Sequence, residues 1–508
     1  MKIILSVIFL LFVLNINYSL AEPSSDKQVL AGLDDIYNLK FDDALKKFKD
    51  LQSSDPKDLK GFFYESLIYF YTALPGRDNK SFENYLQYSG KVIEHAENIL
   101  DKNENDYDAL YYKGLSHSYR SLLMLSLNKS LLQAASDGND GYRILTSLIE
   151  RKPDYYDAYM GLGLYKIAIG FVPEKFQWLL SLIGFNGNIK EGISLLKTSL
   201  QNGKFTKIDS KIFLSLFSLK EREDNDMQSL DFSKDLVREY PESPVFKIFY
   251  SGILLEHGST EEAIEMAENA LKLNSYSFQT DIRKSADALL GSAYFRLNNF
   301  QKAAEYLAEY MRYVNKEDRY NVYLFTLAVS MELSGDRSMA VEKYKNVRNN
   351  FNDERDGEAD KFFYRLAQDK IRAPLSEFDI LMIKGINLRE SNKLIEAIAI
   401  YEDMISSKKI EQFKSDDDLI LFYYNYGLAS IYNKNSDKAT ECFNKCIKLN
   451  PQHETWLLPH SYFELGKIFS NRGDKNTSEK MVEKIFEYDN FDFESLLEMR
   501  LANFINKQ

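Results

Sequence analysis

Histidine and cysteine, the side chains that most often carry out chemistry in proteins, are few and scattered in this sequence. The histidines are His95, His117, His257, His453 and His460, and the cysteines are Cys442 and Cys446. The last two histidines follow the cysteines, but their spacing matches no compact zinc pattern. The cysteines are four residues apart on an expected helix, where a disulfide between them would be strained. We therefore expect no metal site and interpret both cysteines as core residues, with a redox pair as the alternative.

Sequence motifs for catalysis are also missing. The chain contains no G-x-S-x-G, no H-E-x-x-H, no phosphate-binding glycine loop and no EF-hand spacing. Paired carboxylates identify nothing in a chain with 76 acidic residues. We expect neither enzymatic activity nor a cofactor; an enzyme would need a deep pocket with converging titratable groups.

The composition is that of an ordinary soluble protein with a negative balance. Hydrophobic residues make up 44% and charged residues 28% of the 508 positions, and the formal net charge is −12. Nucleic acids and anionic lipid surfaces are disfavoured as partners, because both require clustered lysine and arginine. Proteins or peptides are the expected partners, and the oligomeric state stays open.

The first 21 residues have the organisation of a secretory signal peptide. Lys2 precedes an apolar run from Ile3 to Leu14, and Ser19-Leu20-Ala21 forms an A-x-A-like cleavage site. The apolar run is short for a membrane-spanning helix, so a retained anchor is the alternative. No later run approaches membrane-spanning length. We expect an exported protein in the periplasm or outside the membrane of a bacterium.

Small residues recur at a fixed spacing through the mature chain. In four places a glycine precedes an alanine by twelve residues, and a bulky apolar residue follows the alanine by four. These triplets are Gly32-Ala44-Phe48, Gly291-Ala303-Leu307, Gly385-Ala397-Tyr401 and Gly427-Ala439-Phe443. Two facing helices can approach closely where both lack bulk, and the third residue fills the seam between them. The spacing and its flanking residues resemble the tetratricopeptide repeat, which spans about 34 residues as two helices.

That resemblance predicts an all-α fold, a right-handed superhelix of antiparallel helix pairs with a C-terminal capping helix from Phe491 to Asn506. We expect a signal peptide over 1–21, irregular repeats over 22–275 with an apolar insert at 171–188, and more regular repeats over 276–508.

The segment 171–196 resembles the tetratricopeptide repeat protein 39 and inclusion-body clearance family more specifically. Pro173, the apolar stretch around Trp178, the Gly184-Phe185-x-Gly187 turn and the helix beginning near Gly192 carry the resemblance. It implies an elongated repeat fold with no known catalytic residues. The apolar insert either fills the inner side of the superhelix or forms an exposed patch for a membrane or a partner, which makes Trp178 a candidate contact.

First helices of such repeats line the concave surface where ligands bind. In the last two units the predicted partner-binding residues are Tyr424, Asn425, Leu428, Ile431, Tyr432, Phe463, Lys467 and Asn471. Their aromatic and polar character suits a peptide or helix ligand. The leading hypothesis is therefore an exported scaffold or adaptor for protein–protein interaction. The alternative is an envelope-biogenesis factor that holds lipid or another apolar ligand inside the superhelix.

Overall fold

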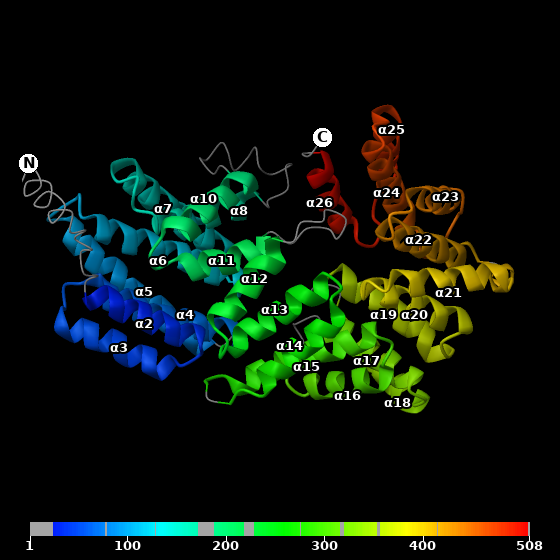
Figure 1. The fold of residues 1–508 in the computed structure, drawn as a ribbon, viewed down its shortest axis with the longest axis horizontal. Coiled ribbons are helices and arrows are strands. Elements are labelled where there is room, and N and C mark those ends of the chain that lie inside the picture. Colours follow the sequence, from blue (N-terminus) through cyan, green and yellow to red (C-terminus); the bar gives the residue numbers. More distant parts are fainter. Residues whose placement is uncertain are drawn as a thin grey trace, which may run out of the picture. The chain divides into compact units, whose positions relative to one another are not determined.

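A computed structural model describes residues 24–76, 79–127, 129–170, 187–217, 228–274, 276–314, 320–352, 356–413 and 415–505. All regular structure in these segments is helical, without a strand (Figure 1). The chain divides into two compact units, and one boundary between them falls within helix α11 (Lys207–Phe217), between Ser210 and Lys211. The predicted signal peptide and most of the predicted insert lie outside the described residues.

The first unit consists of helical hairpins. Its helices are α2 (Ser24–Tyr37), α3 (Phe41–Ser54), α4 (Leu59–Gly76), α5 (Asn79–Leu100), α6 (Tyr107–Ser126), α7 (Leu131–Arg151), α8 (Ala158–Gly170) and α10 (Ile189–Asn202). Gly163 lies in the hairpin formed by α8 and α10. Helices α8 and α10 pair although 18 residues separate them in sequence, and a Cβ on Gly163 would lie 2.8 Å from the carbonyl oxygen of Gly192.

The second unit continues the same pattern. Its hairpin helices are α12 (Gln228–Glu239), α13 (Pro244–Glu256), α14 (Thr260–Leu271), α15 (Gln279–Arg296), α16 (Phe300–Tyr310), α17 (Tyr320–Leu333), α18 (Arg337–Asn350), α19 (Glu358–Arg372), α20 (Glu377–Glu390), α21 (Leu394–Ser406), α22 (Asp416–Tyr432), α23 (Ser436–Cys446), α24 (Leu457–Asn471) and α25 (Lys475–Ile485). A short 3-10 turn, η2 (Lys409–Gln412), precedes α22, and α26 (Glu494–Ile505) ends the chain. No helix among the described segments is long and apolar enough to cross a membrane.

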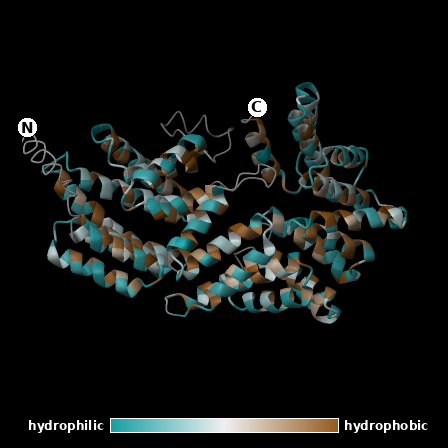
Figure 2. Cartoon of the chain, in the orientation of Figure 1, coloured by the Kyte–Doolittle hydropathy of each residue, from teal (hydrophilic) through white to brown (hydrophobic). Residues whose placement is uncertain are grey.

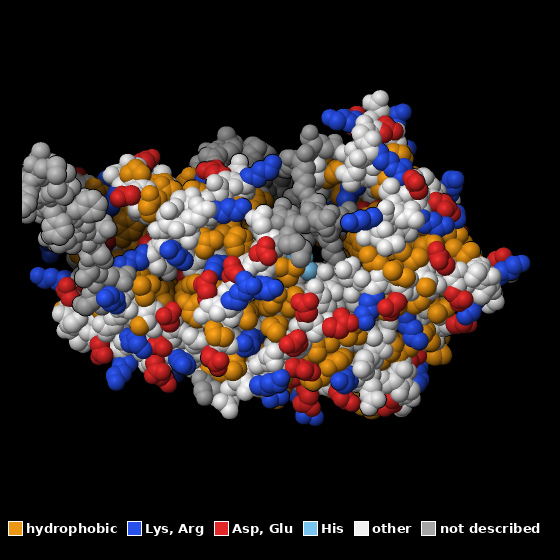
Figure 3. All heavy atoms as spheres, in the orientation of Figure 1, with side chains coloured by type: hydrophobic (Ala, Val, Ile, Leu, Met, Phe, Trp, Pro, Cys, Tyr) orange, Lys and Arg blue, Asp and Glu red, His pale blue; other side chains and the backbone are white. Residues whose placement is uncertain are grey.

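The helices begin and end where local chemistry directs them. Side chains of Ser415, Asn435 and Asp474 each accept a hydrogen bond from a backbone N–H in the first turn of α22, α23 and α25. Turns within hairpins contain a residue with left-handed backbone, such as Gly473 and Lys434. Hydrophobic and hydrophilic residues alternate along many of the helices in Figure 2, as expected for helices that pack on one or two neighbours. Positive and negative side chains are interspersed on the face shown in Figure 3.

Contacts beyond neighbouring hairpins hold the second unit together. The amide nitrogen of Asn387 in α20 donates to the backbone oxygen of Phe295 at 2.7 Å and to Asn298 Oδ1 at 2.9 Å. Ser391, after α20, donates to the backbone oxygen of Arg296 at 3.1 Å. The hairpin of α20 and α21 therefore contacts the hairpin of α15 and α16, about 90 residues earlier.

The predicted all-α tetratricopeptide-type solenoid with a C-terminal cap is confirmed, with α26 at the expected position. The predicted boundary near residue 275 separates irregular repeats from more regular ones, and it stays a prediction. The boundary between the two compact units lies earlier in the sequence, within α11.

Candidate partner-binding face

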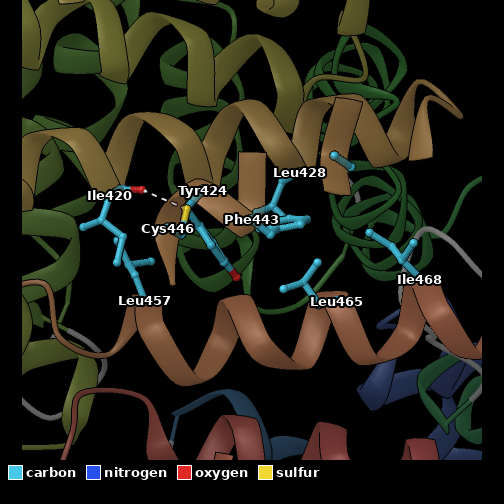
Figure 4. Packing of buried hydrophobic residues seen from close by; sticks show 9 residues of the cluster. Ile420, Tyr424, Leu428, Phe443, Cys446, Leu457, Leu465 and Ile468 are labelled. Atoms are coloured by element: carbon cyan, nitrogen blue, oxygen red, sulfur yellow. Dashed lines mark hydrogen bonds between the residues drawn. The ribbon is translucent and has the colours of Figure 1, made fainter. Parts of the chain in front are cut away.

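The predicted residues of α22 mostly pack inside the unit. Tyr424 and Leu428 are buried in a cluster with Phe443 of α23 and Leu457 and Leu465 of α24 (Figure 4), and Ile431 packs against it. Asn425 is also buried.

The Asn425 amide donates to the backbone oxygen of Leu421 at 2.8 Å, within its own helix. Tyr432, at the end of α22, is half-buried, and its ring lies 5.8 Å from the guanidinium carbon of Arg389.

The predicted residues of α24 differ in exposure along the helix. Phe463 is buried, Lys467 is half-buried and Asn471 is exposed at the last turn. Lys467 Nζ lies 3.4 Å from Glu464 Oε2 and 5.4 Å from the centre of the Phe463 ring. Glu464 itself is fully buried, so its carboxylate depends on the cations around it.

Three cationic side chains from separate helices lie near Tyr424 or Glu464. Arg389 comes from α20, Lys467 from α24 and Arg500 from α26. Burial first, and then the charge of Glu464, raise the pKa of Tyr424, whereas Arg500 and Arg389 oppose that rise. We use the name inner face for the residues of α20, α22 and α24 in this region. They are Arg389, Tyr424, Tyr432, Phe463, Glu464 and Lys467.

Helix α26 already lies on the inner face. Arg500 Nη2 is 2.7 Å from Glu464 Oε1, and the guanidinium carbon of Arg500 is 4.7 Å from the centre of the Phe463 ring. Leu497 and Leu501 are buried in a cluster with Phe463. The ribbon of α26 accordingly runs beside α24 in Figure 1.

The start of α26 also reaches far back in the sequence. Ser495 Oγ donates to Glu358 Oε1 at 2.9 Å, so α26 touches the first turn of α19, 137 residues earlier. Asn490 and Phe493, just before α26, have left-handed φ values of 53° and 62°. This strained link redirects the chain after α25 and lays α26 along α24.

An aromatic cluster anchors that link. The ring of Phe493 lies 5.0 Å from the Trp456 ring and 5.2 Å from the Phe362 ring of α19. Beside it, His460 is buried, and its Nε2 has no hydrogen-bond partner. Burial, followed by the charge of Arg500, lowers the pKa of His460 to about 4. The neutral imidazole is thus the stable form here.

A network of Arg365 reinforces the same region. Its Nη2 lies 3.0 Å from Asp492 Oδ2 and 3.3 Å from Glu454 Oε1, and its Nη1 donates to the backbone oxygen of His453 at 2.6 Å. Trp456 Nε1 donates to Glu454 Oε2 at 2.7 Å. The link before α26 is therefore fixed to α19 and to the start of α24 by charge as well as by packing.

The sequence analysis did not identify Arg389 of the inner face, nor Arg500 of α26 and the aromatic link before that helix. Spacing from the repeat glycines could have indicated Arg389, which lies four residues after Gly385, as Ile431 does after Gly427. No repeat position corresponds to Arg500, because α26 lies outside the repeat.

Other sequence predictions concern chemistry rather than binding. Trp178 lies outside the described residues, so its role stays a prediction. Cys442 and Cys446 are free and buried, and burial raises the pKa of Cys442 to about 12. The described segments contain no group of three or more His, Cys, Asp or Glu side chains placed to hold a metal ion.

Two family models match the sequence. Residues 158–370 match the family described as Iml2/Tetratricopeptide repeat protein 39, and residues 421–453 match a tetratricopeptide repeat. The first match contains the 171–196 segment, and the second contains the Gly427 hairpin. Both predicted resemblances are confirmed.

Several solved structures also match this chain, at low sequence identity. The P58(IPK) tetratricopeptide-repeat domain is 13% identical, covering 83% of this chain and 98% of that one, with a TM-score of 0.19. Human IFIT1, solved as a dimer with PPP-AAAA, is 12% identical over 85% of this chain and 96% of that one, with a TM-score of 0.34. Naa15/Naa10 bound to HypK-THB is 13% identical over 92% of this chain and 95% of that one, with a TM-score of 0.28. These TM-scores support no conclusion about partners. The hairpins and the two family matches instead show that this chain contains tetratricopeptide repeats, with a match to the Iml2/Tetratricopeptide repeat protein 39 family over residues 158–370.

Proposed function

We propose that this protein is an exported, non-catalytic adaptor that binds a protein partner on the inner face of its last two hairpins. Tetratricopeptide repeats are protein-interaction scaffolds, and that general role follows from the repeats themselves. The export, the envelope location and the choice of this face are the specific parts of the proposal.

The observation that carries the proposal is that the inner face holds a helix in the structure. Helix α26 contributes apolar side chains to Phe463 and a guanidinium to Glu464, which are the two elements of helix recognition in a groove. Tyr432 and Lys467 extend the face beyond these contacts and are partly open to solvent. A surface that combines aromatic anchors with arginine and lysine is typical of protein interfaces.

Photocross-linking in cells tests this proposal. We would place p-benzoylphenylalanine at Asn471, which is exposed at the end of α24, and at Glu479, which is exposed on α25, as a matched control. We expect Asn471 to capture a defined protein that Glu479 does not capture. Repeated capture of nothing at Asn471, or of the same proteins at both positions, would contradict the proposal.

The export part has its own test. The sequence of residues 1–21 predicts cleavage after Ala21 and a mature chain starting at Glu22. N-terminal sequencing of protein recovered from the envelope or medium should give that start. Recovery of the chain only from the cytoplasm, beginning at Met1, would contradict export.

A further inference from the structure

We propose that α26 is a displaceable occupant of the inner face, and that the natural partner is an amphipathic helix with a cationic side chain for Glu464 and aliphatic side chains for Phe463. This inference rests on the proposed function, because it names the kind of partner that the face accepts. It also implies that the free protein is self-blocked.

The packing of α26 is one-sided. Leu497 and Leu501 are 1% and 6% exposed, whereas Leu496, Met499 and Ile505 are 44%, 49% and 52% exposed. Helices within the hairpins pack against a partner helix along most of their length, but α26 is held mainly by these two leucines and by Phe504. Local stability follows the apolar contacts that an element buries, so α26 should open more readily than α22 or α24.

Charge then determines what can replace α26. Glu464 is fully buried with α26 in place, and its carboxylate loses the guanidinium of Arg500 and keeps Lys467 at 3.4 Å when α26 leaves. A helix that replaces α26 would bury this carboxylate again. A buried carboxylate that loses a close cation is strongly destabilised, so a replacing helix must supply one. Arginine suits the site better than lysine, because a planar guanidinium can pair with the carboxylate and also stack on Phe463.

The link before α26 allows the helix to leave without unravelling the unit. Phe493 is fixed to Trp456 and Phe362, and Asp492 is fixed to Arg365. By contrast, the contact between Ser495 and Glu358 involves two side chains near the surface. The anchor can therefore stay in place while residues 494–505 detach.

A peptide-binding experiment on the full chain tests the proposal. The probe is a fluorescein-labelled peptide with the sequence of residues 489–505, followed by fluorescence anisotropy. The opened variant is Leu497→Asp/Leu501→Asp, and the matched control is Leu496→Asp/Met499→Asp, which places the same charges on the exposed side of the same helix.

We expect the opened variant to bind the peptide at least 10-fold more tightly than the wild type, because the tethered helix competes at an effective concentration near millimolar. The control should bind like the wild type. Adding Glu464→Gln to the opened variant should weaken binding at least 5-fold. Equal binding by wild-type and opened proteins of unchanged helix content would overturn the proposal.

Hydrogen exchange provides a second measurement that needs no variant. In the wild type, amides of α26 should exchange at least 10-fold faster than those of α22 and α24. Equal protection would overturn displaceability even if the opened variant misfolded. Failure of the Asn471 cross-linking together with tight peptide binding would instead contradict the proposed function while leaving the self-blocking contact intact.

Discussion

The last two hairpins have the same helix pairing but different side chains between the two helices, and the difference lies in how tightly those helices pack. In the first, Gly427 faces Phe443, and a Cβ on the glycine would lie 2.8 Å from the ring. In the second, Gly466 faces Val482, with the nearest atom at 3.3 Å. The alanine of the first hairpin, Ala439, is replaced by Ser478, whose Oγ donates to the backbone oxygen of Gly466 at 2.8 Å.

The tighter hairpin is flanked by repeats on both sides, whereas the looser one is followed only by α26. Phe443 is completely buried among residues of three helices, including Tyr424 and Leu465. The Gly466 hairpin uses a smaller residue in its seam and presents Phe463 and Glu464 to a helix that is not part of a hairpin. The hairpin with the strict repeat residues thus packs between other hairpins, and the hairpin that departs from them packs against α26.

The largest expected effect is on the seam of the tighter hairpin. Gly427→Val should lower the free energy of unfolding by about 3 kcal/mol, because the new side chain has no space beside Phe443. Gly466→Val, the matched control, should cost about 1 kcal/mol, since Val482 can yield. Urea denaturation followed by circular dichroism measures both. Equal costs would show that the two seams are equally tight.

The free energy of unfolding should depend on pH through a histidine of the terminal hairpin. His460 occupies the position that Leu421 occupies in the hairpin before it, six residues ahead of the glycine. Its folded pKa of about 4 lies below the ordinary 6.5, so the unfolded state binds the proton more readily between these values.

Stability contributed by neutral His460 is therefore complete above pH 6.5 and is lost as pH falls toward 4, by about 3 kcal/mol. His460→Gln should remove that part of the pH dependence. The check is the difference between wild type and variant in urea midpoints at pH 4.5 and 7. Parallel pH curves for the two proteins would show that His460 is protonated without penalty.

Shortening a buried side chain of α26 should change the free energy of global unfolding less than the glycine substitutions do. Its effect should be confined to the end of the chain. Leu501→Ala should make α26 less stable locally by about 2 kcal/mol, which is the cost of a buried leucine at a site that can relax. Met499→Ala, on the exposed side, should change it by less than about 0.5 kcal/mol. Native-state hydrogen exchange measures both, and a loss of protection extending into α22 would contradict a separable helix.

The same contrast explains what could be predicted from the sequence. Gly427, Ala439 and Phe443 were recognisable because one spacing places all three in one seam, and the structure has them there. Contacts between residues far apart in sequence could not be predicted that way. The hydrogen bond between Ser495 and Glu358 depends on the path of the chain after Asn490. The ion pair between Arg500 and Glu464 depends on the position that the same path gives to α26.

The predicted binding residues show what helical periodicity alone could not predict. Tyr424, Leu428 and Ile431 lie on one side of α22, where they pack in or against one hydrophobic cluster. Periodicity does not say whether that face meets solvent or another helix, and α24 and its neighbours cover most of it. Of the predicted residues, Asn471 at the end of α24 is exposed, whereas Ile431, Tyr432 and Lys467 are half-buried. Whether any of them contacts a partner stays a prediction for cross-linking to decide.

The smallest expected effect concerns the serine that replaces the repeat alanine. Ser478 is buried, and its hydroxyl donates to a helix carbonyl of Gly466 that also belongs to the hydrogen bonds of α24. Ser478→Ala removes one net hydrogen bond without leaving a buried donor unsatisfied, so the loss should be about 0.5–1 kcal/mol in urea denaturation. An increase in stability would mean that alanine is the better residue for this seam as well. The looseness of the terminal hairpin would then come from Val482 alone, and Val482→Phe would be the substitution that converts it into a copy of the hairpin before it.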